Sequence, residues 1–164
     1  MRNEDDLKLS KQGEKMELQT QRLVIVPCTD EVFSVYATKG FKIGSHINNY
    51  LKKLKEDPSL LGWGVWLVIN KEDNTIIGDI GFKGKPDSEN IVEVGYGIIP
   101  AAQNKGFATE AVNEIIKWAF STGTVKKIVA ECLIDNISSI KVLKKLNMKR
   151  IGIKDNMYIW QLNK

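Results

Sequence analysis

The chain has 164 residues, which is the length of one ordinary domain and too short for two full ones. Apolar residues make up 43% and charged residues 27%, a globular composition that excludes disordered and fibrous proteins. A net charge of +4 permits an anionic ligand or a nucleic acid but requires neither. Cys28 and Cys132 are too few for a disulfide framework, and a single histidine, His46, excludes a histidine metal cluster.

The N-terminal residues do not predict export. Residues 1–17 are polar and charged and lack the apolar core of a signal peptide, so we expect a flexible tail before one domain that covers 18–164. No apolar run approaches the roughly 18 residues of a membrane-spanning helix. With two cysteines that we expect to be reduced thiols, the sequence predicts a cytoplasmic protein with no membrane partner.

The first half of the chain predicts a strand, two short helices and a strand meander. An apolar run over 22–27 ends at a proline and predicts the strand. Apolar residues at helical spacing predict helices over 31–38 and 48–56. Three β-rich runs then follow, joined by polar turns that are typical of an antiparallel meander. These runs cover 63–70, 75–82 and 91–99.

The second half returns to a helical period. Apolar residues recur at i, i+3, i+4 and i+7 from Ala108 to Phe120, which is the strongest helix signal in the chain, and Gly123 predicts its end. A strand is predicted over 127–134, and Asn136 predicts the cap of a further helix.

The C-terminal pattern completes the sheet. Asn147 stands where a left-handed helix cap is expected, and a terminal strand pair is predicted over 148–153 and 156–162. The order of elements predicts an α/β fold. It has a mixed, mostly antiparallel central sheet of about seven strands, flanking helices and a crossover helix in its middle.

A short loop, residues 101–106, leads from the meander into the strongest helix. A helix N-terminus leaves N–H groups unpaired and carries the positive end of the helix dipole, so it favours an anion. Gly106 lets the backbone approach a ligand, Ala108 keeps the first turn unobstructed and Lys105 adds a positive charge. The loop predicts either a pyrophosphate site or an ordinary strand-to-helix turn. The Walker phosphate-binding loop, G-x-x-x-x-G-K-S/T, is absent. Pro100 stands where the G-x-G-x-x-G fingerprint of dinucleotide-binding proteins requires its last glycine.

Four segments in order resemble the GCN5-related N-acetyltransferases. Residues 103–111 (QNKGFATEA) match the Q/R-x-x-G-x-G/A signature of that family and the start of the helix that follows it. Residues 20–23 (TQRL) resemble the opening of the branch that acetylates ribosomal protein N-termini. Residues 93–97 (EVGYG) resemble the family's fourth strand, and residues 135–140 with 145–148 (DNISSI and KLNM) resemble a later helix. The resemblance covers about residue 18 to the end and implies a sheet that splays between its fourth and fifth strands.

The resemblance implies acetyl-CoA as co-substrate and no metal. The pantetheine arm is expected between strands 91–99 and 127–134, with the acetyl carbonyl against the amides of Gly97 to Ile99. The diphosphate is expected on the amides of Gln103 to Thr109, and a lysine of the later helix at the ribose phosphate. The implied cofactor contacts are Gly97, Ile98, Ile99, Gln103, Asn104, Lys105, Gly106, Phe107, Ala108, Thr109, Asn136, Ser139, Lys141 and Lys144.

The implied reaction is acetyl transfer to an amine, which arrives protonated and needs a base. Glu93 stands on the family's acidic position and is the expected base, with a salt-bridged strand carboxylate as the alternative; Asp79 and Glu131 are weaker candidates. Many relatives carry a tyrosine proton donor where this chain has Leu143. Ser139 aligns with the serine that the ribosomal-protein branch offers instead, although a serine also suits a helix start.

The acceptor is expected to be the amine of a protein N-terminus or of a small molecule, attacked directly in a ternary complex. The chain is expected to act as a monomer or homodimer. Tyr96 is expected in the core, and His46 lies ahead of the second predicted helix, in the region that forms the acceptor side in the family. One alternative is a non-catalytic acyl-CoA sensor. A nucleic-acid-binding domain is weaker, because the basic residues of 141–150 are spread around a helix and its exit.

Overall fold

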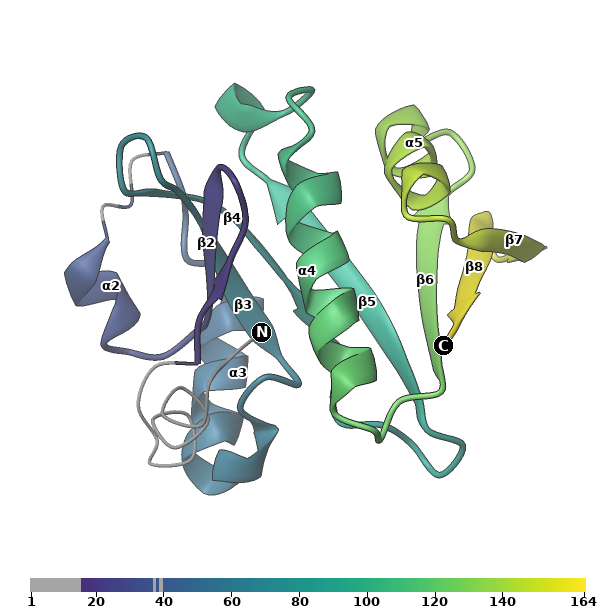
Figure 1. Ribbon diagram of the computed structural model, residues 1–164, viewed down its shortest axis with the longest axis horizontal. Coiled ribbons are helices and arrows are strands. Elements are labelled where there is room, and N and C mark those ends of the chain that lie inside the picture. The colour runs from purple at the N-terminus through teal and green to yellow at the C-terminus, as the bar shows by residue number, and fades with distance from the viewer. Residues whose placement is uncertain (1–15, 37, 39) are drawn as a thin grey trace.

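The computed structural model describes residues 16–36, 38 and 40–164. Its centre is an 8-stranded sheet in the spatial order β1-β2-β3-β4-β5-β6-β8-β7, shown in Figure 1. The strands are β1 (Leu18–Gln19), β2 (Leu23–Pro27), β3 (Val65–Asn70), β4 (Thr75–Phe82), β5 (Ile91–Ile98), β6 (Lys127–Leu133), β7 (Lys149–Lys154) and β8 (Met157–Asn163). The predicted α/β class is confirmed, and the strand beyond the expected seven is the two-residue β1. Of the predicted N-terminal tail, 1–15 lie outside the described residues.

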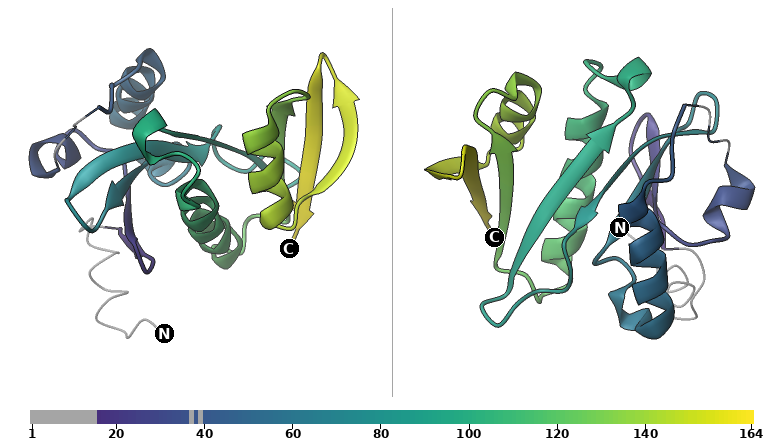
Figure 2. Two further views of the ribbon diagram at one scale, coloured as in Figure 1. Left: turned by 90° about the horizontal axis from the view of Figure 1, so that it is seen from above. Right: turned by 180° about the vertical axis from the view of Figure 1, so that it is seen from behind.

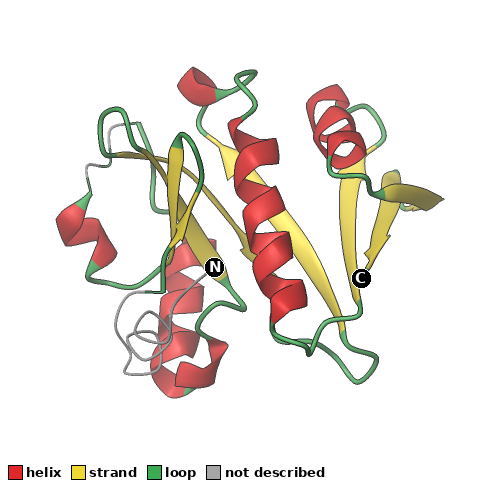
Figure 3. Ribbon diagram, viewed as in Figure 1, coloured by secondary structure: helices red, strands yellow, loops and turns green. Residues whose placement is uncertain are grey.

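Helices cover both faces of the sheet. In the view from above in Figure 2, α4 (Phe107–Ser121) lies on the opposite side of the sheet from α3 (Ser45–Glu56). The secondary-structure colouring of Figure 3 shows α4 in front of the strands. The remaining helical segments are α2 (Val32–Val35), η1 (Pro58–Leu60), η2 (Pro100–Ala102) and α5 (Ile137–Lys145).

The strands β5 and β6 form the one parallel pair of the described sheet, and α4 is the crossover between them. Their pairing covers Ile91–Glu93 opposite Lys127–Val129, whereas β5 remains paired with β4 as far as Ile98. Beyond Glu93 the two strands therefore separate, as Figure 1 shows. The expected splay between the fourth and fifth predicted strands is confirmed.

Apolar side chains form a core on each face of the sheet. The helix α4 buries Ala111 and Ile115 against a cluster that includes Trp66. On the other face, α3 buries Ile47 against a second cluster that includes Leu67. Because full burial of one large aliphatic side chain stabilises a fold by about 1.5–3 kcal/mol, these two cores hold β3 and β4 in place from both sides, and the first core also holds β5.

Three predicted boundaries in the first half were wrong. The helix expected over 31–38 is α2, which buries none of its residues and ends where Tyr36 becomes extended. The helix expected from Asn48 begins at Ser45, because the extended Gly44 precedes it, so His46 lies in its first turn. The strand expected from Trp63 begins at Val65, since the Trp63 N–H still donates to Leu60 in the preceding turn.

The second half follows its prediction closely. Asn136 accepts the Ser139 N–H and caps α5, and Gly123 (φ 78°) and Asn147 (φ 63°) adopt the left-handed conformation expected after helices. Both cysteines are free and buried. Among the described residues, no helix has both the length and the apolar character needed to span a bilayer.

Candidate active site

A cleft of about 590 Å³ lies where β5 and β6 separate. Its walls are β5, the loop between η2 and α4, and α5. The cleft brings together most of the residues that the resemblance implied as cofactor contacts, namely Gly97, Ile98, Gln103, Asn104, Gly106, Phe107, Ala108, Thr109, Asn136, Ser139 and Lys141. Ile99, Lys105 and Lys144 do not line it; Ile99 and Lys105 line a second hollow behind the loop.

The edge of β5 offers a backbone donor to this cleft. The Ile99 N–H donates to the Ile77 carbonyl at 2.8 Å, and bonds across an antiparallel ladder fall on every second residue. The Gly97 N–H therefore faces β4, whereas the Ile98 N–H faces the cleft. Of the three amides expected at the acetyl carbonyl, the amide of Ile98 is the one left for a ligand.

The loop before α4 holds a run of free amides. The Gln103 N–H is occupied, because it donates to the Pro100 carbonyl at 3.2 Å. In the described chain, no acceptor is recorded for the amides from Asn104 to Thr109, and Glu110 is the first to bond back, to the Gly106 carbonyl at 3.1 Å. Free N–H groups at the positive end of a 15-residue helix form a site for an anion.

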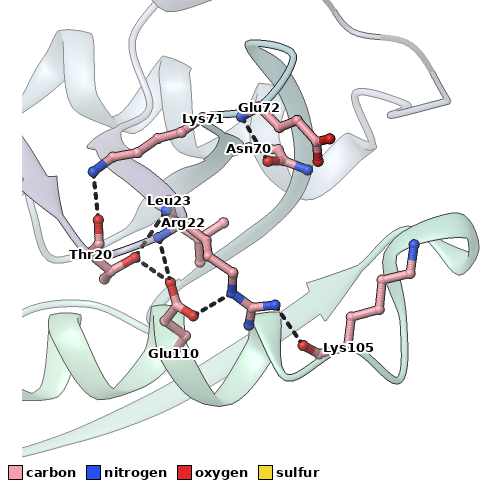
Figure 4. Close-up of polar contacts among 8 residues, drawn as sticks. All are labelled: Thr20, Arg22, Leu23, Asn70, Lys71, Glu72, Lys105 and Glu110. Atoms are coloured by element: carbon pink, nitrogen blue, oxygen red, sulfur yellow. Dashed lines mark hydrogen bonds and ion pairs between the residues drawn. The ribbon is translucent and has the colours of Figure 1, made fainter.

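Two sequence motifs meet to hold this loop, as Figure 4 shows. Thr20 donates its hydroxyl to the Glu110 carboxylate, and the Arg22 guanidinium donates to the same carboxylate at 2.8 Å. Arg22 also donates to the Lys105 carbonyl at 2.9 Å and lies over the Phe107 ring, 4.2 Å from its centroid. The turn between β1 and β2 thus fixes both the loop and the first turn of α4.

These contacts change the titration of Glu110. Burial alone would raise the pKa of this carboxyl, but hydrogen bonds from Thr20 and Arg22, together with the Arg22 charge, lower its pKa overall. The Lys71 ammonium donates to the Thr20 carbonyl at 2.6 Å and so joins the network from β3's end. Glu110 is therefore held ionised, and a carboxylate in the first turn of a helix also favours the helix dipole.

The α5 wall of the cleft carries the expected asparagine and serine. Asn136 Oδ1 accepts the Ser139 N–H at 3.1 Å, and the Tyr96 hydroxyl donates to the Ser139 carbonyl at 3.4 Å. Burial is the main cause that raises the pKa of Tyr96, so its hydroxyl stays protonated at neutral pH. Leu143, which stands where many relatives carry tyrosine, is fully buried.

The acidic candidates are placed differently from one another. Glu93 is ion-paired with Lys83 and does not line the cleft. Asp79 on β4 is paired with His46. Glu131 is exposed on β6. Among the described residues, no group of three His, Cys, Asp or Glu side chains is placed to hold a metal ion.

Some cleft residues were not predicted as site residues. Tyr96, Ser138, Val142 and Lys145 line the cleft, and Lys145 takes the place expected for Lys144. Residues four positions apart lie on the same face of a helix, so the spacing of Lys141 and Lys145 could have indicated that both face the cleft. The role of Arg22 could not be seen, because it contacts Glu110 across 88 positions of sequence.

The chain matches a family model described as "Acetyltransferase (GNAT) domain" over residues 26–149, and it belongs to that family. A curated relative is the uncharacterized N-acetyltransferase YjdG of Bacillus subtilis, 38% identical over 85 residues, which are 52% of this chain and 51% of the relative. The chain therefore spans about half the length of the curated relatives it matches.

Solved structures share the fold. The ribosomal-protein-S5-alanine acetyltransferase of Vibrio fischeri aligns with a TM-score of 0.74 and 18% identity, covering 90% of this chain and 96% of that one. The microcin C7 self-immunity acetyltransferase MccE, in complex with acetyl-CoA and AMP, aligns with a TM-score of 0.64 and 16% identity, covering 88% and 93%. At these identities the likeness concerns the fold alone.

Proposed function

We propose that the protein transfers an acetyl group from acetyl-CoA to a primary amine. The observation that carries this proposal is the run of free amides from Asn104 to Thr109 at the mouth of the β5–β6 cleft. Such a run fits the diphosphate of the co-substrate, and Arg22 and Glu110 hold it in shape before a ligand arrives.

The cleft has room for the rest of the co-substrate. The pantetheine arm would lie along β5, with the Asn136 side chain beside its amides and the Ile98 N–H directed at the acetyl carbonyl. An N–H group at that carbonyl stabilises the negative oxygen that develops when an amine attacks. Lys141 and Lys145 line the outer part, where the ribose phosphate would reach, and Lys144 follows between them on the exposed face of α5.

The acceptor amine would attack the thioester directly in a ternary complex, after losing a proton to a base. Glu93 is the base that the sequence predicts, and Ser139 is the predicted group at the leaving sulfur. Because a thiol ordinarily titrates near about 8.5, its thiolate leaves without a strong acid. The wall that carries Ser139 is therefore expected to position the thioester more than to protonate it.

We propose the amine of a protein N-terminus or of a small molecule as acceptor, in the cytoplasm, with the protein acting as a monomer or homodimer. The fold shared with a ribosomal-protein-S5-alanine acetyltransferase supports the first class. Two probes separate these classes: spermidine, and a peptide whose first residue is alanine. A chain that binds acetyl-CoA and transfers to no amine would instead be an acyl-CoA sensor.

The first experiment compares thermal unfolding with and without acetyl-CoA. A ligand at a hundredfold excess over Kd adds about 2.7 kcal/mol, which raises the Tm of a domain of this size by roughly 5–10 °C. Ala108→Glu should remove most of that shift, because the new carboxylate would repel the diphosphate while suiting a helix N-terminus.

The matched control is Asn113→Glu, which adds the same charge to an exposed position of α4 outside the cleft. This variant should keep the full shift. An unchanged Tm in the wild-type protein, or an equal shift in both variants, would contradict the assignment of the loop. Release of free thiol with the alanine peptide or spermidine then measures transfer itself.

A further inference from the structure

A histidine–carboxylate pair lies on the face of the sheet that carries α3. His46 Nε2 and Asp79 Oδ2 are 2.9 Å apart, although the residues are 33 positions apart in sequence. The His46 side chain is 60% exposed and that of Asp79 is 23% exposed. The pair is thus fixed by a short contact and still open to a ligand on the histidine side.

The pair stands beside the backbone at which the acetyl group is expected. Asp79 on β4 is the register partner of Gly97 on β5. Directly opposed residues of antiparallel strands point to the same face with Cβ positions about 4.5–5.5 Å apart. Gly97 is exposed, lines the cleft, and has open space where a Cβ would lie. Asp79 therefore lies on the same face of the sheet as Gly97 and brings the His46 ring to that face, outside the residues that line the cleft itself.

The hydrogen bond sets which nitrogen can take a proton. An ionised carboxylate only accepts, so Nε2 carries the hydrogen and Nδ1 keeps its lone pair. Nδ1 has no hydrogen-bond partner among the described residues. It lies against Gly44, where an added Cβ would come within 3.0 Å of it. A glycine at that position leaves Nδ1 uncovered.

The sequence-predicted base is less well placed. Glu93 is four positions before Gly97 on β5, which at about 3.3 Å per residue separates them by ~13 Å along the strand. Its carboxylate is also paired with Lys83. The two acidic pairs thus lie at opposite ends of a bare stretch of β5 whose residues on this face are Gly95 and Gly97.

We propose that His46, held by Asp79, is the general base that deprotonates the acceptor amine, in place of Glu93; this inference rests on the proposed acetyl transfer. The ammonium gives one proton to Nδ1, and the imidazolium formed is stabilised by the Asp79 carboxylate. The neutral amine forms the C–N bond as the C–S bond breaks. The second proton of the nitrogen goes to the leaving sulfur, so that the products are an acetamide and free thiol.

The thiol of Cys28 and the phenol of Tyr50 near the pair are not bases at neutral pH. Burial, followed by the charges of Asp79 and Asp30, raises the pKa of Cys28 to about 12. Burial, followed by Cys28, raises the pKa of Tyr50 to about 12. Both groups therefore stay protonated at neutral pH, and the His46 ring is the proton acceptor that the pair offers.

The kinetic test uses His46→Gln, which can keep the hydrogen bond to Asp79 but cannot take up a proton. We measure kcat at saturating acetyl-CoA with saturating alanine peptide or spermidine. We expect kcat to fall about a hundredfold and to lose the decrease that the wild-type enzyme shows at acid pH. Asn49→Gln, an exposed position on the same helix, is the control. Asp79→Asn should lower kcat, whereas Asp155→Asn in the exposed β7–β8 turn should leave kcat unchanged.

An independent test does not depend on turnover. Because the chain has one histidine, its imidazole resonances are assigned without ambiguity. Nitrogen-15 shifts of the neutral ring should report the Nε2–H form. The Nδ1–H form would overturn the pairing.

Different results would overturn the base role of His46 and the proposed acetyl transfer. This inference would be overturned if His46→Gln kept the wild-type kcat and its decrease at acid pH while Glu93→Gln lost that decrease. The base role would then return to Glu93. Absence of any acetyl-CoA-induced rise in wild-type Tm would overturn the proposed function itself. A rise in Tm with no transfer to either probe would contradict the base role and favour a sensor.

Discussion

Gly97 is a glycine that the packing of the strands does not require, whereas Gly78 on the neighbouring strand is required by that packing. A Cβ at this position would meet no atom within 4 Å, whereas a Cβ at Gly78 would lie 2.3 Å from the Gly97 carbonyl oxygen. Gly78 is therefore required by the close approach of β4 and β5. Gly97 has no such neighbour, and its lack of a side chain leaves space at the cleft.

We predict that Gly97→Val keeps the Tm within about 2 °C of wild type, because valine suits a strand and its Cβ would meet no atom within 4 Å. The same change should lower kcat/KM for acetyl transfer by more than about tenfold, since the side chain would occupy the space of the reacting groups. Thermal unfolding and thiol release measure the two effects. Gly78→Ala is the contrasting variant and should lower stability by about 1–3 kcal/mol. Full activity in Gly97→Val would show that nothing binds over this residue.

Ser139 and Tyr96 test how much acid the leaving sulfur needs. Ser139→Ala and Tyr96→Phe each remove one hydroxyl from the α5 side of the cleft. We predict that each lowers kcat by less than about tenfold, because a thiolate is already a good leaving group. Single-turnover thiol release at saturating substrates measures this. A loss near a thousandfold in either variant would instead identify an obligatory proton donor.

At the residue scale, the sequence predicted which residues line the cleft better than it predicted which side chains contact one another. Asn136, Gly106 and Ala108 were predicted from helix-start chemistry, and all three line the cleft. His46 could be placed near the acceptor side but not beside Asp79. The reason is physical: a contact across 33 positions depends on how α3 packs on β4, which no local pattern encodes.

At the element scale, the start of α4 depends on a segment far away in sequence. Glu110 is held by Thr20 and Arg22, and the same arginine holds the Lys105 carbonyl of the loop. Arg22 is 41% exposed, so we assign its ion pair only about 1 kcal/mol of stability. The larger effect is on the shape of the loop, because ordering it beforehand lowers the cost of binding.

The lowered pKa of Glu110 gives the pH dependence its sign. A carboxyl with a lower pKa in the folded than in the unfolded state adds stability above its unfolded value, near about 4.3, and this stability is lost as the pH falls through the folded pKa. We predict that Glu110→Gln lowers the free energy of unfolding at pH 7. The difference from wild type should shrink as the pH falls below about 4.

Urea unfolding of both proteins at a series of pH values checks this, with Glu89→Gln at an exposed turn position as control. A difference that stays constant down to acid pH would contradict the role of the charge. The acetyl-CoA-induced rise in Tm should also be smaller in Glu110→Gln, because the loop loses its support.

Elements with a strong period were predicted well. The stripe from Ala111 to Ala119 fixed α4 within about one residue at each end, because its apolar face packs along the sheet. The helix α2 was overestimated, since Val32 and Phe33 are only partly buried against the second core and Val35 is 59% exposed. Without burial, propensity alone sustains a short helix poorly.

At the scale of the whole molecule, the site follows from the topology. The sheet is antiparallel except where α4 crosses from β5 to β6, and there the pairing ends after Glu93. The edge of β5 beyond that point keeps backbone groups that a sheet would normally pair. The loop that starts α4 opens at the same place, so one change in strand pairing supplies both parts of the binding site.

The order of elements could be predicted from the sequence, and the motif resemblance implied the splay. The sequence did not reveal that the T-x-R-L motif, the loop and the first turn of α4 form a single network. That network joins segments 83 to 90 positions apart in sequence, and they become neighbours because α4 packs against β1 and β2.

The most direct measurement is the response of the individual loop amides to coenzyme A in nitrogen-15 NMR spectra of the full chain. We predict that the N–H resonances from Asn104 to Thr109 move furthest on saturation, as each free hydrogen meets a diphosphate oxygen, and that the resonance of Asn113 stays in place. Binding with these resonances unmoved, or with the largest changes on another face of the protein, would contradict it.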